Sequence, residues 1–198
     1  SIVTKSNLVC RDLDILSAMS KRGLVTVAFS VATLNRKLAR MMEPRAVTPE
    51  KRLSAINALA KAEVPSFVLV APVIPALTDM EMEAVLGRAA GCGAIGAEYI
   101  LLRLPLEIKA LWREWLAEHY PDRAKRIMRH IREARGGKEY DSKFHRRMVG
   151  VGPYAELINQ RFELACKTLR LQPRREQTIV NSELFAVPKE EKRQLSLL

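Results

Sequence analysis

The sequence contains little cysteine, few aromatic residues and no long apolar run. Its three cysteines, Cys10, Cys92 and Cys166, are too scattered for a disulfide framework and lack the short spacings of zinc or iron–sulfur sites. No stretch of about 18 apolar residues suggests a membrane span, and the first ten residues lack the basic region and apolar stretch of a signal peptide. We therefore expect a soluble, cytoplasmic chain with reduced thiols, no bound metal and no membrane partner.

Acidic residues are in the minority. The 198 residues include 33 lysines and arginines against 22 aspartates and glutamates, a net charge of +11, and residues 103–175 account for +9 of it. An apolar content of 48% with 28% charged residues is ordinary for one globular domain with a tail. Because Ile2 and Val3 already resemble the interior of a strand, we expect the chain to begin within a domain.

Four short apolar segments predict buried parallel strands, because each is rich in β-branched residues and is followed by a helical pattern. They span residues 2–4, 24–31, 66–70 and 97–102. The intervening segments carry apolar residues at intervals of three and four, as one-sided helices do. Thr48 followed by Pro49 marks the start of one of these helices, since threonine caps helices and proline favours their first position. The pattern is that of an α/β fold with a parallel sheet.

The pattern changes after residue 104. Residues 106–120 and 121–135 read as two basic amphipathic helices, and Trp112 and Trp115 are expected to pack the first of them against the sheet. A polar, basic loop follows, and a last helix is predicted for residues 153–171. The remaining residues, 172–198, are mixed in character, with a weak strand pattern at residues 178–180.

Ligands of parallel α/β folds bind at the carboxyl ends of strands, so residues there are the first candidates for a site. Lys5 follows the first strand directly and could pair with a carboxylate or phosphate; equally, its side chain could extend into solvent. A GxGxxG pattern at residues 91–96 follows a helix and enters a strand, which is the reverse of a dinucleotide fingerprint. We interpret it as a loop whose glycines permit the turn.

Several ordered blocks resemble a known family. TKS with RDLDIL, FSVAT, EPRAVTPEKRL, VLVAPVIPALTD, YILLRLPLEIK, RGGKEYDSKF and GPYAELINQRF are similar to the C-terminal two-thirds of a radical S-adenosylmethionine (radical SAM) protein of the spore photoproduct lyase-like group. The resemblance runs from about residue 2 to residue 171. It implies an α/β fold, a partial parallel (β/α) barrel with about four strands of the family's six, followed by C-terminal helices. The implied divisions are a partial barrel at 1–105, a basic helical region at 106–171 and a tail at 172–198.

The resemblance also implies three cofactor-binding positions. Lys5 matches the lysine that meets the methionyl carboxylate of S-adenosylmethionine, and Ser30 matches a serine that hydrogen-bonds the same cofactor. Ala71 matches the position whose backbone lies against the adenine. Glu43 and Arg45 belong to the family pattern but are assigned no contact, and we expect them to brace the loop before Thr48.

One departure from the family concerns catalysis. The family binds a [4Fe–4S] cluster through a CxxxCxxC loop after its first strand, and no such loop occurs in these 198 residues. The resemblance therefore implies S-adenosylmethionine and a [4Fe–4S] cluster in a full-length protein, and neither of them on this chain alone. We assign no catalytic residue and no metal ligand, and we expect this chain by itself to be inactive.

The basic half offers a second site. One face of a helix can carry five cations, Arg123, Lys125, Arg126, Arg129 and Arg132, and a loop cluster adds Arg146 and Arg147. The competing interpretation is a solvated surface whose positive charge is partly balanced by nearby glutamates.

The sequence leaves three candidate functions: the C-terminal part of a radical SAM enzyme, a nucleic-acid-binding module without catalysis, or an interaction scaffold. A partial barrel also leaves a sheet edge at residues 2–4 and apolar strand surface, so a homodimer through that edge or through the apolar strand faces is expected.

Overall fold

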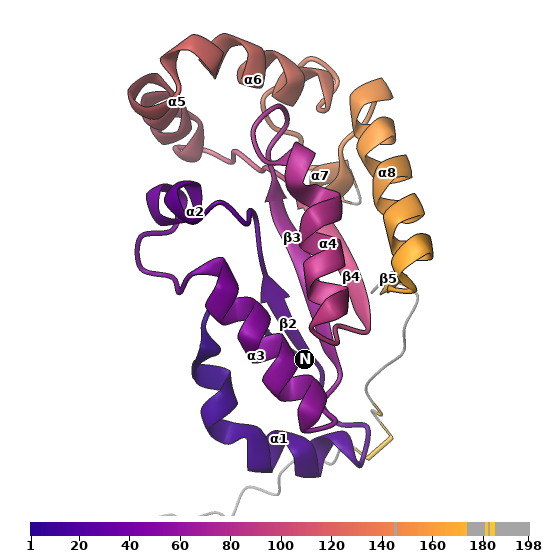
Figure 1. Cartoon of the computed structure of the whole chain (residues 1–198). Helices are drawn as coiled ribbons and strands as arrows, with labels where there is room; N and C mark the ends of the chain where they lie inside the picture. Colours follow the sequence, from indigo (N-terminus) through magenta and orange to yellow (C-terminus); the bar gives the residue numbers. More distant parts are fainter. Residues whose placement is uncertain (145, 174–180, 182, 185–198) are drawn as a thin grey trace, which may run out of the picture.

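In the computed structural model, five strands form one parallel sheet within the described residues, which are 1–144, 146–173, 181, 183 and 184. The strands lie side by side in chain order (Figure 1). Their bounds are β1 Ile2–Thr4, β2 Val27–Ser30, β3 Ser66–Val73, β4 Gly96–Leu101 and β5 Gln172–Pro173. This sheet, with helices between its strands and further helices after it, is the α/β partial barrel that the sequence predicts.

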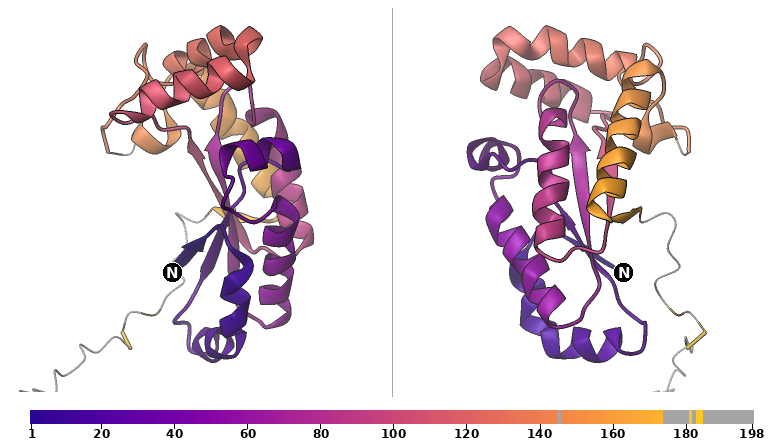
Figure 2. Two further views of the ribbon diagram at one scale, coloured as in Figure 1. Left: turned by 90° about the vertical axis from the view of Figure 1, so that its left-hand side faces the viewer. Right: turned by 45° about the vertical axis from the view of Figure 1, so that its right-hand side comes forward.

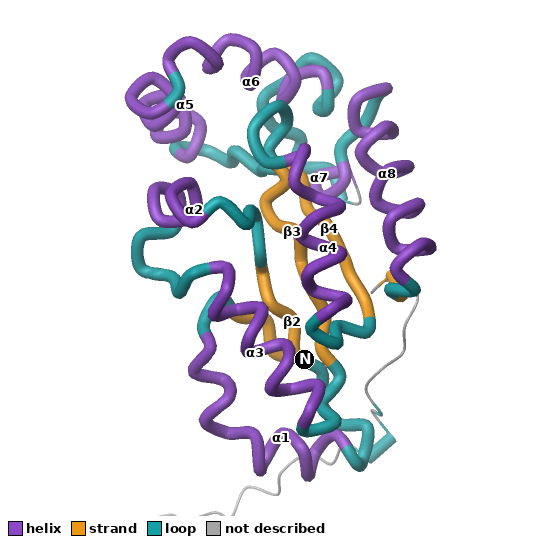
Figure 3. The backbone as a smooth tube through the Cα atoms, in the orientation of Figure 1, coloured by secondary structure: helices purple, strands orange, loops and turns teal. Residues whose placement is uncertain are grey.

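The helices alternate with the strands up to β4 and then follow one another (Figure 3). Helix α3 starts at Pro49 with Thr48 at the N-cap position, as predicted, although the Thr48 side chain makes no capping hydrogen bond. In α2, the Asn35 side chain accepts a hydrogen bond from the backbone N–H of Leu38 at 3.0 Å, which satisfies the first turn. The helix bounds are η1 Asn7–Asp12, α1 Leu13–Ser20, α2 Arg36–Met42, α3 Pro49–Lys61, η2 Asp79–Glu81, α4 Met82–Gly91, α5 Ile108–His119, α6 Pro121–Glu133, α7 Arg146–Val149 and α8 Pro153–Leu169.

The main core lies between one face of the sheet and helices α1, α3, α4 and α8 (Figure 2). Alternate strand residues such as Phe29, Val68 and Tyr99 point into it, and Phe162 of α8 packs on Tyr99 with ring centroids 4.9 Å apart. The opposite face carries a smaller buried cluster that includes Ala28 and Phe67. The two faces are therefore distinct, as they are on the outside and inside of a barrel wall.

A second core closes the carboxyl end of the sheet. Helices α5 and α6 lie across that end (Figure 1), and their apolar residues pack on Ile74 and Leu104, which follow β3 and β4. Trp112 is buried in this cluster and stacks on Trp115 at 5.0 Å between ring centroids, so the pair packs α5 against α6 and the segments that follow β3 and β4 rather than against the strands themselves. The strand ends where a ligand is expected thus have a helical cover on one side.

Two details extend what the sequence predicts, and one prediction falls on residues that the structure does not describe. The strand β5, at Gln172–Pro173, pairs with β4 and was not predicted. The polar loop before α8 contains the short helix α7, Arg146–Val149. The weak strand pattern at residues 178–180 lies outside the described residues.

The described helices are too short or too polar for any of them to cross a membrane.

Candidate site at the carboxyl ends of the strands

The three residues predicted to bind a cofactor lie at neighbouring strand ends. Lys5 follows β1, Ser30 ends β2 and Ala71 lies near the end of β3. The register pairs Thr4 with Phe29 and Ser30 with Leu69, so Lys5, Ser30 and Ala71 all fall on the face opposite the main core. The structure therefore brings the three positions together on what would be the inside of a barrel.

A chain of polar contacts connects these positions. The Lys5 ammonium lies 2.7 Å from one carboxylate oxygen of Glu43, and the other oxygen accepts a hydrogen bond from Arg52 at 2.5 Å. Arg52 also donates to the carbonyl oxygen of Ser30 at 2.7 Å. The Ser30 hydroxyl in turn donates to the carbonyl oxygen of Ala71 at 2.9 Å. One continuous network thus runs from β1 to β3.

Arg52 is the centre of this network and was missed by the sequence analysis. Its side chain is 2% exposed, although it lies on α3 in a segment that reads as an ordinary charged helix. A third hydrogen bond, from Nε to the carbonyl oxygen of Val47 at 3.0 Å, completes its contacts. A buried guanidinium is tolerated only when its donors are satisfied and its charge is paired, and Glu43 supplies the pairing.

Glu43 therefore does more than the sequence suggested. We expected Glu43 and Arg45 to brace the loop before Thr48, and the Glu43–Arg52 pair does hold that loop to α3. However, Glu43 also reaches Lys5 on another strand, a contact that the sequence analysis did not assign. Arg45 is exposed.

The three cysteines do not form a common site. Cys10 lies in η1, where its thiol faces the carbonyl oxygen of Ala55, Cys92 follows α4, and Cys166 is buried in α8. Burial raises the pKa of the Cys10 thiol, which disfavours the thiolate that metals bind. Within the part of the chain that the structure describes, no group of three or more histidine, cysteine or acidic residues could hold a metal ion.

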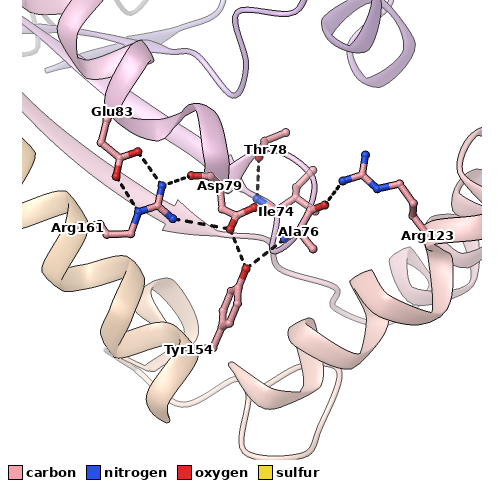
Figure 4. A network of polar contacts seen from close by, with 8 residues as sticks. All are labelled: Ile74, Ala76, Thr78, Asp79, Glu83, Arg123, Tyr154 and Arg161. Carbon is pink, nitrogen blue, oxygen red and sulfur yellow. Dashed lines mark hydrogen bonds and ion pairs between the residues drawn. The ribbon is translucent and has the colours of Figure 1, made fainter.

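A second polar network fixes the loop after β3 to α8 (Figure 4). The Tyr154 hydroxyl donates to Asp79 at 2.7 Å and accepts from the backbone N–H of Ala76 at 3.3 Å. Arg161 bonds both oxygens of Glu83 at 2.7 Å and the carbonyl oxygen of Asp79 at 2.9 Å. The loop beside the Ala71 position is therefore held in place from the C-terminal helices.

Burial and the Asp79 carboxylate raise the pKa of Tyr154 to about 12. Both causes disfavour the phenolate, because burial penalises any charge and Asp79 adds a like charge. Asp79 is itself buried, and among the described residues its Oδ1 atom has no hydrogen-bond partner. Tyr154 is thus the main group that satisfies this carboxylate.

The basic residues predicted for nucleic acid lie on two elements. Lys125, Arg126 and Arg129 are exposed on α6, whereas Arg146 and Arg147 belong to α7, where Arg147 lies 4.8 Å from the centre of the Phe144 ring. Arg129 pairs weakly with Glu133 at 3.7 Å. Neither Lys125 nor Arg126 has a carboxylate within ion-pair distance in the described part of the chain.

Two other cations of α6 are already engaged. Arg123 turns inward and donates to the carbonyl oxygen of Ala76 (Figure 4). Arg132 shares Glu139 with Arg113, at 2.9 and 2.7 Å. The accessible cationic surface of α6 is therefore narrower than its sequence suggests.

Known proteins resemble parts of this chain. It is 36% identical over 124 residues to an uncharacterized protein of Mycobacterium tuberculosis, an alignment that covers 62% of this chain and 36% of that protein. It is 27% identical over 122 residues to an uncharacterized protein of Methanocaldococcus jannaschii, covering 62% of this chain and 44% of the relative. No solved structure matches the chain. The chain therefore spans less than half the length of these relatives.

The most specific match concerns the N-terminal part. Residues 1–89, which contain Lys5, Ser30, Glu43, Arg52 and Ala71, match the model of the Radical SAM superfamily. All of the network at the strand ends thus lies inside the segment that this superfamily model describes.

Proposed function

We propose that this chain is the C-terminal part of a radical SAM enzyme whose full-length form binds a [4Fe–4S] cluster and S-adenosylmethionine. The observation that carries the proposal is the joint position of Lys5, Ser30 and Ala71. They lie on one face at three neighbouring strand ends, inside the segment that matches the superfamily model. Carboxyl ends of parallel strands are where such folds bind their ligands.

The residues present fit S-adenosylmethionine. The Lys5 side chain is 48% exposed, and an ammonium group has three donors, so Lys5 can meet a ligand carboxylate while it keeps its contact with Glu43. Ser30 lies beside it, with its hydroxyl oxygen able to accept a further hydrogen bond. Bound S-adenosylmethionine would supply a 5′-deoxyadenosyl radical on reduction. The role of Lys5, Ser30 and the Ala71 backbone is to bind and orient that ligand.

The residues present do not fit the cluster. Each cysteine lies on a different element, and the described residues offer no group of ligands for a metal ion. We therefore derive no step from the cluster and assign it to the longer protein. Such a protein belongs in the cytoplasm, where thiolates stay reduced.

The test is reconstitution of the longer protein. The reading frame upstream of Ser1 is expected to encode CxxxCxxC, and the reconstituted protein should be brown and form 5′-deoxyadenosine when reduced. A Lys5→Met variant of it should keep the cluster absorbance and bind S-adenosylmethionine more weakly. A protein that carries the cluster but forms no 5′-deoxyadenosine would contradict the proposal.

A lyase-like activity on a DNA photoproduct is the finer version of this proposal. It rests on the ordered blocks of sequence that resemble the spore photoproduct lyase-like group. Incubation of the reconstituted protein with ultraviolet-irradiated DNA should then restore the original bases. Formation of 5′-deoxyadenosine without any such repair would retain the radical SAM proposal and exclude the lyase.

The second candidate function is binding of nucleic acid without catalysis. It is favoured by Lys125 and Arg126, which are exposed and have no ion pair in the described part of the chain. Protein–DNA affinity should fall steeply with salt, and the triple variant Lys125→Ala, Arg126→Ala, Arg129→Ala should reduce the slope by about 2 to 3 units. Exposed lysines of α3, replaced in a Lys51→Ala, Lys61→Ala control, should leave it unchanged. An unaltered slope in the triple variant would exclude this surface.

The expected homodimer remains a prediction that follows from the exposed edge of the partial barrel. β1 pairs with β2 alone among the described strands, and Val3 is 55% exposed. A dimer through this edge should dissociate when Val3 is replaced by lysine, because charged side chains discourage edge pairing. Sedimentation of a monomer at all concentrations would refute it.

A further inference from the structure

The position of Lys5 depends on residues that are not on its own strand. A lysine side chain has four flexible bonds, and about 2 kcal/mol of rotamer entropy must be lost when its ammonium is held in one place. Lys5 is about half exposed, so packing alone does not hold it. Its one ion-pair partner among the described residues is Glu43, at 2.7 Å.

Glu43 is held more firmly than Lys5. Its side chain is 12% exposed, and Arg52 binds its second oxygen at 2.5 Å. Arg52 cannot easily move, because it is 2% exposed and also donates to the backbone carbonyl oxygens of Ser30 and Val47. Arg52, bonded to the end of β2, is therefore the most firmly held of the three side chains, Glu43 is held by Arg52, and Lys5 is held by Glu43.

The charges of the three side chains matter as well. Lys5 and Arg52 are cations and Glu43 is an anion, so the group carries one net positive charge. A singly charged carboxylate arriving at Lys5 would make that group neutral. Without Glu43, the buried Arg52 would have no carboxylate partner, and the Lys5 ammonium would no longer have a fixed position.

We propose that Glu43, anchored by Arg52, is a positioning residue that holds the Lys5 ammonium where a ligand carboxylate binds. This inference rests on the proposed function, because it takes the methionyl carboxylate of S-adenosylmethionine as the ligand. Glu43 does not touch the ligand in this scheme. Glu43 reduces the conformational entropy that the Lys5 side chain loses when a ligand binds, and it fixes the direction in which the Lys5 ammonium points toward the ligand carboxylate.

The first test needs no ligand. Acetylation of Lys5 by a limiting reagent is followed by mass spectrometry, with exposed Lys125 of the same chain as the internal reference. In Glu43→Gln, the rate for Lys5 relative to Lys125 should rise about threefold, as expected when a half-exposed ion pair is lost. The control Glu114→Gln, an exposed glutamate of α5, should leave the ratio unchanged. An unchanged ratio in Glu43→Gln would overturn the proposal.

The second test measures coupling on the ligand. In the reconstituted longer protein, the affinity for S-adenosylmethionine should fall about tenfold in Glu43→Gln, and Glu43→Gln should add nothing in a protein that already carries Lys5→Met. Additive losses would mean that Glu43 acts independently of Lys5, and would overturn the proposal. If Glu43→Gln does not fold, Glu43→Asp serves instead, because it keeps the charge but shortens the reach to Lys5.

The two tests separate this inference from the proposed function. If the reconstituted longer protein fails to bind S-adenosylmethionine, the proposed function is wrong, whatever the acetylation ratio. If it binds S-adenosylmethionine and Lys5→Met weakens binding while Glu43→Gln does not, the proposed function holds and Glu43 is only a brace for the loop before Thr48.

Discussion

Replacing Tyr154 by phenylalanine should destabilise the fold, because it removes the main hydrogen bond to a buried carboxylate. The hydroxyl donates to Asp79 at 2.7 Å, and the next nearest donor, Arg161, is 3.9 Å away. A hydrogen bond to a charged group contributes about 1.5–3 kcal/mol, and the longer bond from the Ala76 N–H adds less. We therefore expect a loss of about 2–3 kcal/mol in the free energy of unfolding.

The assay is urea unfolding followed by far-ultraviolet circular dichroism. With a slope of about 2 kcal/mol per molar urea, the midpoint should fall by about 1 M at unchanged slope. Tyr120→Phe is the matched control, since the Tyr120 hydroxyl has no hydrogen bond among the described residues. In an Asp79→Asn background, Tyr154→Phe should have a smaller effect because no charge is left unsatisfied. A loss below about 0.5 kcal/mol in the single variant would refute the role given to this hydrogen bond.

Three further predictions follow from other positions. The raised pKa of Tyr154 favours its neutral form in the folded state. The stability that this group contributes is therefore complete below about pH 10, where tyrosine ionises in unfolded chains, and is lost as the pH rises toward about 12. Absorbance at 295 nm should show one tyrosine that titrates late, and Tyr154→Phe should abolish that late phase. Gly96→Ala should lower the free energy of unfolding by about 1–3 kcal/mol, because a Cβ there would meet the Phe67 ring at 2.6 Å. Gly87→Ala, in α4, should raise it by about 0.5–1 kcal/mol, because a Cβ there meets nothing within 4 Å. Thermal unfolding distinguishes the two signs. Arg135→Met should cost about 2–4 kcal/mol by urea unfolding, because it leaves buried carbonyl oxygens without donors.

Much of the fold could be predicted from local pattern. Short β-branched runs and one-sided helices are set by burial on one side, so four of the five strands and the start of α3 were found. β5 could not be found because it has two residues, Gln172 and Pro173, and proline is a poor strand former. β5 forms because α8 brings the chain back beside β4, and this tertiary contact leaves no local pattern in the sequence.

The candidate site was predictable in part for the same reason. Lys5 and Ser30 are recognisable because each ends a strand, and strand ends share one edge of a parallel sheet. The burial of Arg52 was not predictable, because an arginine that follows Glu50 and Lys51 at the start of a helix looks like a surface residue. Its burial results from the path of the loop that places Glu43 opposite it. The signal that could have found it is the short spacing between Glu43 and Arg52 across a proline-rich loop.

Arg52 has a counterpart at the other side of the sheet. Arg135, after α6, donates to the carbonyl oxygens of Leu101 and Leu102 at the end of β4, as Arg52 does to Ser30 at the end of β2. Strand ends in a parallel sheet leave carbonyl oxygens without ladder partners, and a guanidinium has enough donors to satisfy several of them.

The two arginines differ in charge balance. Glu43 pairs with Arg52, whereas no carboxylate lies within ion-pair distance of Arg135 in the described part of the chain, and burial together with the Arg103 cation lowers the pKa of Arg135. Backbone carbonyl oxygens accept the hydrogen bonds of Arg135, and Asp141 adds a Coulombic attraction without an ion pair, which suits a structural clamp between β4 and α7. Glu43 also contacts Lys5 through its other oxygen. This pairing, which the Arg135 clamp lacks, supports our proposal that a charged ligand binds at the end of β2.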